Sequence, residues 1–91
     1  MLKHITTDSG FEVDLDIELL DDMELFDLII EIDGGEFKNI PKFLRKILSE
    51  KDIKRLYDHV RLEGGRVPAS KVALEIGNIF ATLNEVEGKK K

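Results

Sequence analysis

The chain has 91 residues, of which 42% are apolar and 36% charged, and its formal net charge is −5 at pH 7. This length leaves room for one domain with a thin core, because a domain of this size buries only about 60 to 70% of its unfolded surface. The chain contains no cysteine, which excludes disulfide scaffolds, cysteine zinc sites and thiol catalysis and fits a reducing cytosol.

The N-terminal segment has the pattern of a small β-hairpin. Residues 11 to 17 alternate between apolar and acidic side chains, which is the period of a half-buried strand. Residues 2 to 7 are rich in β-forming residues, and the turn sequence Asp8-Ser9-Gly10 separates the two runs. We therefore expect an N-terminal hairpin or arm over residues 1–17, which must pack on the helices or on a partner to be stable.

The first helix is predicted to begin near Asp21, with Glu24 three residues later, and to end at Gly34-Gly35. Its apolar residues form two adjacent stripes that cover more than half of the circumference. One stripe consists of Leu19, Met23, Phe26 and Ile30, and the other consists of Leu25, Leu28, Ile29 and Ile32. Such a helix is either central to its own bundle or keeps one stripe for another chain.

We expect the first stripe to hold the core through Phe26 and Ile30. The second stripe would then bind a client protein through Leu25, Leu28 and Ile32. The alternative is that the apolar face of the hairpin covers the second stripe and leaves nothing for a client.

Two further helices are predicted in the middle of the chain. Apolar residues repeat at helical spacing from Phe37 to Leu48, and the regular helix should start close to Pro41, which is tolerated only in a first turn. Ser49 resembles the cap of a third helix, which Gly64-Gly65 should close.

The last helix should have Pro68 in its first turn. Its predicted apolar face consists of Val72, Ala73, Ile76, Ile79, Phe80, Leu83 and Val86. Gly77 and Ala81 lie beside that face and would let another backbone approach closely. The outer side of this helix, with Leu74 and Ala81, is the second candidate surface for protein binding.

Together these segments predict a mainly α fold, a small bundle of about four helices with a short N-terminal β-hairpin. The helical domain should span residues 18–87, and residues 88–91 should form a basic disordered tail.

Charge is distributed unevenly along the chain. Residues 1–35 contain eleven acids and one base, whereas residues 36–91 contain eight acids and thirteen bases. The two parts either neutralise one another across the folded domain or leave one charged face for a partner.

The residues give no support for catalysis, a metal site or a cofactor. His4 and His59 lie in different predicted elements without a second ligand at helical zinc spacing, and the acids lack the pattern of a calcium loop. The serines have no evident base. We expect neither an enzyme nor a nucleic-acid-binding protein, because the chain is acidic and shows no RNA-binding or recognition-helix pattern beside the basic helix around Lys42. Without a long apolar run or a signal pattern, we expect no membrane insertion or secretion.

Several segments together resemble the tail assembly chaperones of long-tailed bacteriophages and prophages of Gram-positive bacteria. These segments are a Gly-Phe-x-Val strand, Leu-Leu-Asp-Asp-Met-Glu-Leu (19–25), Glu-Ile-Asp-Gly-Gly (31–35), Leu-Tyr-Asp-His-Val-Arg (56–61) and Glu-Gly-Gly-Arg-Val-Pro-Ala-Ser-Lys-Val (63–72). The similarity covers roughly residues 10–87, and its motifs are helix and cap patterns without a catalytic signature.

The resemblance implies a non-enzymatic protein of the bacterial host cytoplasm. Its partners would be the tape measure protein, which it keeps soluble, and the major tail protein, which it recruits. Self-association is a further expectation. The resemblance also implies a longer product made by ribosomal frameshifting, with which the terminal Gly-Lys-Lys-Lys is compatible, although a basic tail alone explains it equally. The competing function is a small acidic phage regulator that binds a repressor or another DNA-binding protein.

Overall fold

The computed structural model describes the backbone of residues 1–88 and the side chains of residues 1–82. Of the expected tail at residues 88–91, residues 89–91 lie outside this range, while Gly88 belongs to the last helix. The predicted inward positions of Leu83 and Val86 also lie outside the described side chains.

The predicted N-terminal hairpin is present. Strand β1 (Leu2–Thr6) pairs with β2 (Glu12–Asp16) in antiparallel register, with Leu2 opposite Asp16. The alternation places Val13 and Leu15 of β2 in the core while the acids between them face solvent. Gly10 completes the turn with a φ of 93°, which glycine adopts without strain. The second strand ends one residue earlier than expected, because Ile17 starts the 3-10 helix η1 (Ile17–Leu20).

The first helix, α1 (Met23–Asp33), begins after Asp22, one residue later than the expected Asp21. The Asp22 carboxylate accepts a 2.9 Å hydrogen bond from the backbone N–H of Glu24, which satisfies a free donor of the first turn. Gly34-Gly35 ends the helix as predicted, and the second glycine has a φ of 102°.

The chain then passes through the 3-10 helix η2 (Phe37–Asn39) into α2 (Ile40–Ile47), and Pro41 lies in the first turn of α2 as predicted. The cap of α3 (Glu50–Val60) is also confirmed, since Ser49 Oγ accepts a 3.2 Å hydrogen bond from the backbone N–H of Asp52.

The predicted closure of α3 by Gly64-Gly65 is wrong, because the helix ends at Val60. Gly65, with a φ of 96°, instead shapes the loop that follows. The Arg61 guanidinium holds this loop by donating a 2.7 Å hydrogen bond to the Gly65 carbonyl. Pro68 lies just before α4 (Ala69–Gly88), and its carbonyl accepts hydrogen bonds from the first turn of that helix.

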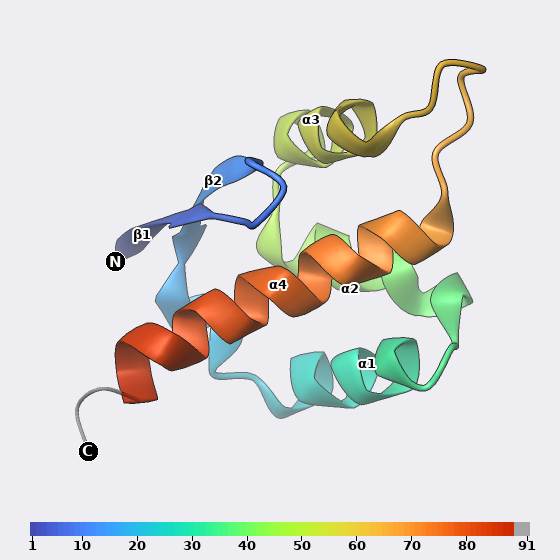
Figure 1. The fold of residues 1–91 in the computed structure, drawn as a ribbon. Coiled ribbons are helices and arrows are strands. Elements are labelled where there is room, and N and C mark those ends of the chain that lie inside the picture. Colours follow the sequence, from blue (N-terminus) through green and yellow to red (C-terminus); the bar gives the residue numbers. More distant parts are fainter. Residues whose placement is uncertain (89–91) are drawn as a thin grey trace.

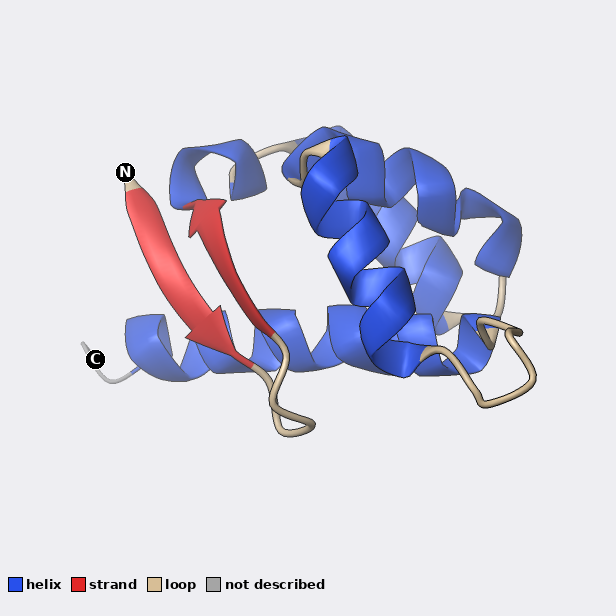
Figure 2. Ribbon diagram, turned by 90° about the horizontal axis from the view of Figure 1, so that it is seen from above, coloured by secondary structure: helices blue, strands red, loops and turns tan. Residues whose placement is uncertain are grey.

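Over residues 1–88 the fold class is the predicted one, with four α-helices and a two-stranded N-terminal hairpin around one core. Helix α4 crosses the molecule, with the hairpin on one side of it and α1 on the other (Figure 1). The hairpin lies over α4 beside α3 and closes that end of the core (Figure 2). Buried side chains from both strands and all four helices form a single cluster, whose largest fully buried members are Phe43, Ile5, Leu15, Leu25, Leu44, Leu56 and Ile79.

Candidate functional site

The two apolar stripes of α1 have the opposite roles to those expected. Leu25, Leu28 and Ile32 are buried, with exposed fractions of 0%, 7% and 3%. Met23 and Ile30, in contrast, are 67% and 65% exposed, and Phe26 between them is 39% exposed. The expectation that Leu25, Leu28 and Ile32 form an exposed client-binding stripe is therefore wrong, and so is the expectation that Phe26 and Ile30 hold the core.

Polar contacts with α2 and η2 accompany this rotation of α1. The Nζ atom of Lys46 on α2 lies 3.8 Å from carboxylate oxygens of both Asp22 and Glu24. In the last turn of α1, Glu31 Oε1 accepts a 2.7 Å hydrogen bond from Asn39 Nδ2. Since Glu24 and Glu31 lie on one flank of α1, the opposite flank, which carries Ile29 and Phe26, faces away from α2.

The outer side of α4 carries the two residues proposed for it. Leu74 is 72% exposed, and Gly77 and Ala81 are exposed on the same side. The neighbouring flank of α4 packs on the hairpin turn, because Glu75 accepts a 2.8 Å hydrogen bond from Thr7 Oγ1, and Asn78 Oδ1 accepts one of 2.6 Å from a turn backbone N–H. The other flank of α4, with Ala73 and Phe80, is thereby directed away from the hairpin.

The exposed sides of α1 and α4 are adjacent. The helices are in contact, and α1 lies on the side of α4 away from the hairpin (Figure 1). By the 100° spacing on each helix, Ile29 of α1 and Ala73 and Phe80 of α4 lie on the flanks of the exposed residues, and all three are partly buried against the core. We call the combined surface the α1–α4 face, and its exposed members are Met23, Phe26, Ile30, Leu74, Gly77 and Ala81. Its members are apolar residues or glycine on two helices that are in contact.

Acidic side chains border this face. By their spacing on the helix, Asp27 lies beside Met23 and Ile30 on one edge of the α1 stripe, and Asp33 lies beside Ile30 on the other edge, one turn nearer the end of α1. Both are exposed. Within the part of the chain whose side chains are described, neither forms an ion pair, and Lys46 is the one base that pairs with the acids of α1 and its cap.

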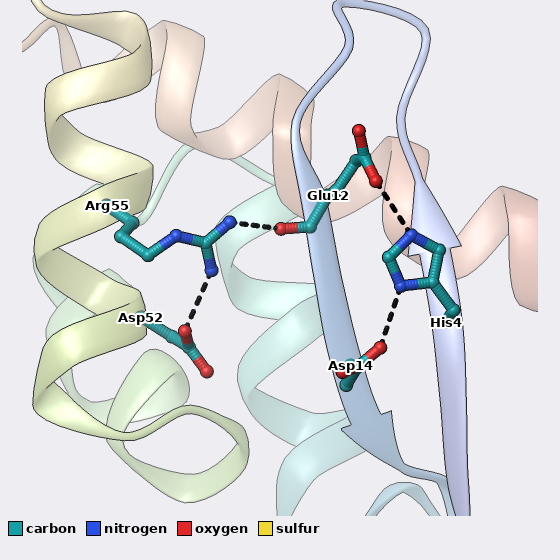
Figure 3. A network of polar contacts seen from close by, with 5 residues as sticks. All are labelled: His4, Glu12, Asp14, Asp52 and Arg55. Carbon is teal, nitrogen blue, oxygen red and sulfur yellow. Dashed lines mark hydrogen bonds and ion pairs between the residues drawn. The ribbon is translucent and has the colours of Figure 1, made fainter.

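A separate polar network covers the outer face of the hairpin (Figure 3). His4 Nδ1 lies 2.7 Å from an Asp14 carboxylate oxygen, and His4 Nε2 lies 2.9 Å from one of Glu12. These bonds, that to Asp14 first, raise the pKa of His4 above its ordinary value of 6.5, because both carboxylates favour the protonated ring. Nearby, Arg55 donates a 2.7 Å hydrogen bond to the Glu12 carbonyl and a 2.8 Å bond to Asp52.

Beside this network is an open hollow, lined by His4, Gly10, Phe11, Glu12, Arg55, Asp58 and His59. The Arg55 guanidinium carbon lies 5.3 Å from the centre of the Phe11 ring, a cation–π contact that ties α3 to the hairpin. Most of the polar groups of the hollow are thus already paired with one another, which favours a role in folding over ligand binding.

One sequence expectation about chemistry also needs correction, because Ser9 does lie beside a base. Its Oγ is 2.9 Å from His59 Nε2 and donates a 2.7 Å hydrogen bond to Glu75 Oε2. Separations of 50 and 66 residues leave no local signal of this contact in the sequence. The order is not that of a nucleophilic triad, in which histidine lies between serine and carboxylate. Here the serine lies in the middle and bridges the turn to two helices.

Among the residues that the structure describes, no group of three or more His, Cys, Asp or Glu side chains could hold a metal ion. In that same part of the chain, no helix has the length and apolarity needed to cross a bilayer. Comparisons with protein-family models, with curated proteins and with solved structures found no match.

Proposed function

We propose that the protein is a tail assembly chaperone that binds the tape measure protein through the α1–α4 face. The observation that carries this proposal is the exposure of Met23 and Ile30, two large apolar side chains about two-thirds exposed on one side of α1. A contiguous exposed apolar surface on a small domain is typical of a protein interaction site. The resemblance of the sequence to tail assembly chaperones supplies the identity of the client.

The physical requirements of such a chaperone agree with this surface. A long helical client exposes apolar residues before assembly, and its chaperone must cover them while the complex remains in solution. The α1–α4 face provides the apolar contact, and a net charge of −5 opposes aggregation of the complex. Under this proposal the protein performs no catalysis, acts in the bacterial cytoplasm and recruits the major tail protein at a later step.

The proposal is tested by co-expressing the chain with the tape measure protein of the same genome. The wild type should keep that client soluble and co-purify with it in about half-molar salt, where the Debye length is only a few ångströms and apolar contacts persist. The double variant Phe26→Ser, Ile30→Ser should lose co-purification. A matched control, Leu2→Ser, changes an exposed apolar residue on the hairpin and should retain it. No binding by the wild type would refute the proposal.

The second candidate, an acidic regulator that binds a DNA-binding protein, draws support from the outer face of β2. Glu12 and Asp14 are exposed there in a row with the half-exposed Asp16. His4 lies between two of these carboxylates and, when it is protonated, offsets part of their negative charge, which weakens this candidate. Binding by such a regulator would be mainly electrostatic, so it should collapse in half-molar salt and should not depend on Ile30.

A further inference from the structure

Building on the proposed function, we infer the chemistry of the segment that the α1–α4 face binds: an amphipathic helix whose apolar side is bordered by lysine or arginine. The face is formed by residues of two helices. The distance along the axis of α1 from Met23 to Ile30 is about 10 Å. That length matches about two turns of a partner helix presenting residues three and four apart.

The shape of the face favours close approach by a helix. On α4, Gly77 lies between the exposed Leu74 and the flank that faces α1, so the helix presents backbone without a side chain at this position. A Cβ atom added to Gly77 would meet no atom within 4 Å, which shows that the space above this glycine is open. Ala81, one turn further on, is equally small. A partner side chain can therefore approach the α4 backbone closely at Gly77, beside Leu74.

The charge of the face selects a basic partner over a second copy of this chain. On the α1 part of the face, residues 17–35 contain seven acids and no base, and Asp27 and Asp33 lie on opposite edges of the apolar stripe. On the α4 part, the exposed Lys71 lies one turn before Leu74. A symmetric pair of chains would bring the same acidic borders together, which is unfavourable. A helix with basic residues on both sides of its apolar stripe would instead place opposite charges next to Asp27 and Asp33.

A pair of designed peptides tests this inference without the natural client. Both are 18-residue amphipathic helices with the same leucine face, one bordered by lysine and the other by glutamate, and each carries a fluorescent label. Fluorescence anisotropy in low salt should show that the wild-type protein binds the lysine-bordered peptide at least about tenfold more tightly than the other. Equal binding of the two peptides would overturn the inference.

Gly77→Gln locates the binding without risk to folding. Glutamine is a better helix former than glycine, and its side chain has open space here, so the melting temperature should be unchanged or higher. The glutamine side chain would occupy the open space above position 77 and should weaken binding of the lysine-bordered peptide by about tenfold or more. The control Gly64→Gln, in the loop before α4, also has open space and should leave binding unchanged. Undiminished binding to Gly77→Gln would show that the peptide docks elsewhere.

Charge reversal gives an independent test. The double variant Asp27→Lys, Asp33→Lys should reverse the preference toward the glutamate-bordered peptide. The control Glu50→Lys, Glu63→Lys makes the same change in net charge at other exposed acids and should keep the original preference. A dimer that Gly77→Gln dissociates, measured by sedimentation, would assign the face to a second copy and overturn the inference.

The experiments distinguish a wrong chaperone function from a wrong basic-helix inference. If the tape measure protein co-purifies but Gly77→Gln and the charge reversal have no effect on that complex, the basic-helix inference is wrong and the chaperone function stands. If the lysine-bordered peptide binds as expected but the tape measure protein does not, the client identity is wrong and the chemistry of the face stands.

Discussion

The Thr7 hydroxyl donates a 2.8 Å hydrogen bond to the carboxylate of Glu75, a residue 68 positions later in the chain that is only 8% exposed. Ser9 donates a second hydrogen bond, of 2.7 Å, to the other oxygen of the same carboxylate. A buried carboxylate is tolerated when hydrogen-bond donors replace the water that it has lost. This contact joins the hairpin turn to α4 and keeps the hairpin on the helices.

Removing the Thr7 hydroxyl should therefore destabilise the fold. Thr7→Val preserves the shape of the side chain but leaves one oxygen of Glu75 without its donor, and it removes the acceptor of the Phe11 backbone N–H at 3.1 Å. We expect the free energy of unfolding to fall by about 1 to 3 kcal/mol in urea denaturation. Thr6→Val, at the exposed neighbouring position, should change it little, and equal effects of the two variants would contradict the role given to Glu75.

Because the Leu28 stripe of α1 is buried and the Ile30 stripe is exposed, two similar substitutions should destabilise the protein by very different amounts. Leu28→Asp places a charge among core side chains and should cost several kcal/mol, enough to unfold much of the protein. Ile30→Asp places the same charge at an exposed position and should cost less than about 1 kcal/mol. Thermal unfolding followed by circular dichroism measures both. Comparable melting temperatures for the two variants would mean that Leu28 is not part of the core.

The His4 network predicts a pH dependence with a definite sign. The pKa of His4 is raised in the folded protein, chiefly by the hydrogen bond to Asp14 and then by that to Glu12. The stabilisation is therefore fully present below the unfolded pKa, near 6.5, and is lost as pH rises through the higher folded value. An NMR titration should give a pKa above 6.5 for His4 in the wild type and a lower one in Asp14→Asn. A wild-type value at or below 6.5 would exclude the network in solution.

Substituting Gly35, which follows the end of α1, should destabilise the fold through its backbone conformation. Gly35 has a φ of 102°, and an added Cβ would meet nothing within 4 Å, so a substitution there is unfavourable through backbone strain alone. Gly35→Ala should lower the free energy of unfolding by about 1 to 2 kcal/mol. Gly64→Ala, which has the same open space without a positive φ, is the control and should have a smaller effect. Chemical denaturation distinguishes them, and no difference would argue against the left-handed turn at Gly35.

The sequence alone determined the secondary structure well, because the signals for it are local. The alternation of residues 11 to 17 identified β2, and Ser49 and Gly34-Gly35 marked helix ends through hydrogen bonds to backbone groups a few residues away. The end of α3 was missed because Gly64-Gly65 looks like a helix stop, whereas contacts of Arg61 with the loop hold a turn beyond the helix.

The outward face of α1 was decided by the tertiary structure. Both stripes of that helix are apolar, so the helical period cannot rank them. The choice depends on the packing of Leu25, Leu28 and Ile32 in the core formed with later segments, and Lys46 and Asn39 add polar contacts on one flank of α1. The same holds for Ser9, His59 and Glu75, which meet only when the hairpin turn reaches α3 and α4. Periodicity determines which residues share a side of a helix, but the direction in which that side points depends on contacts between residues far apart in the chain.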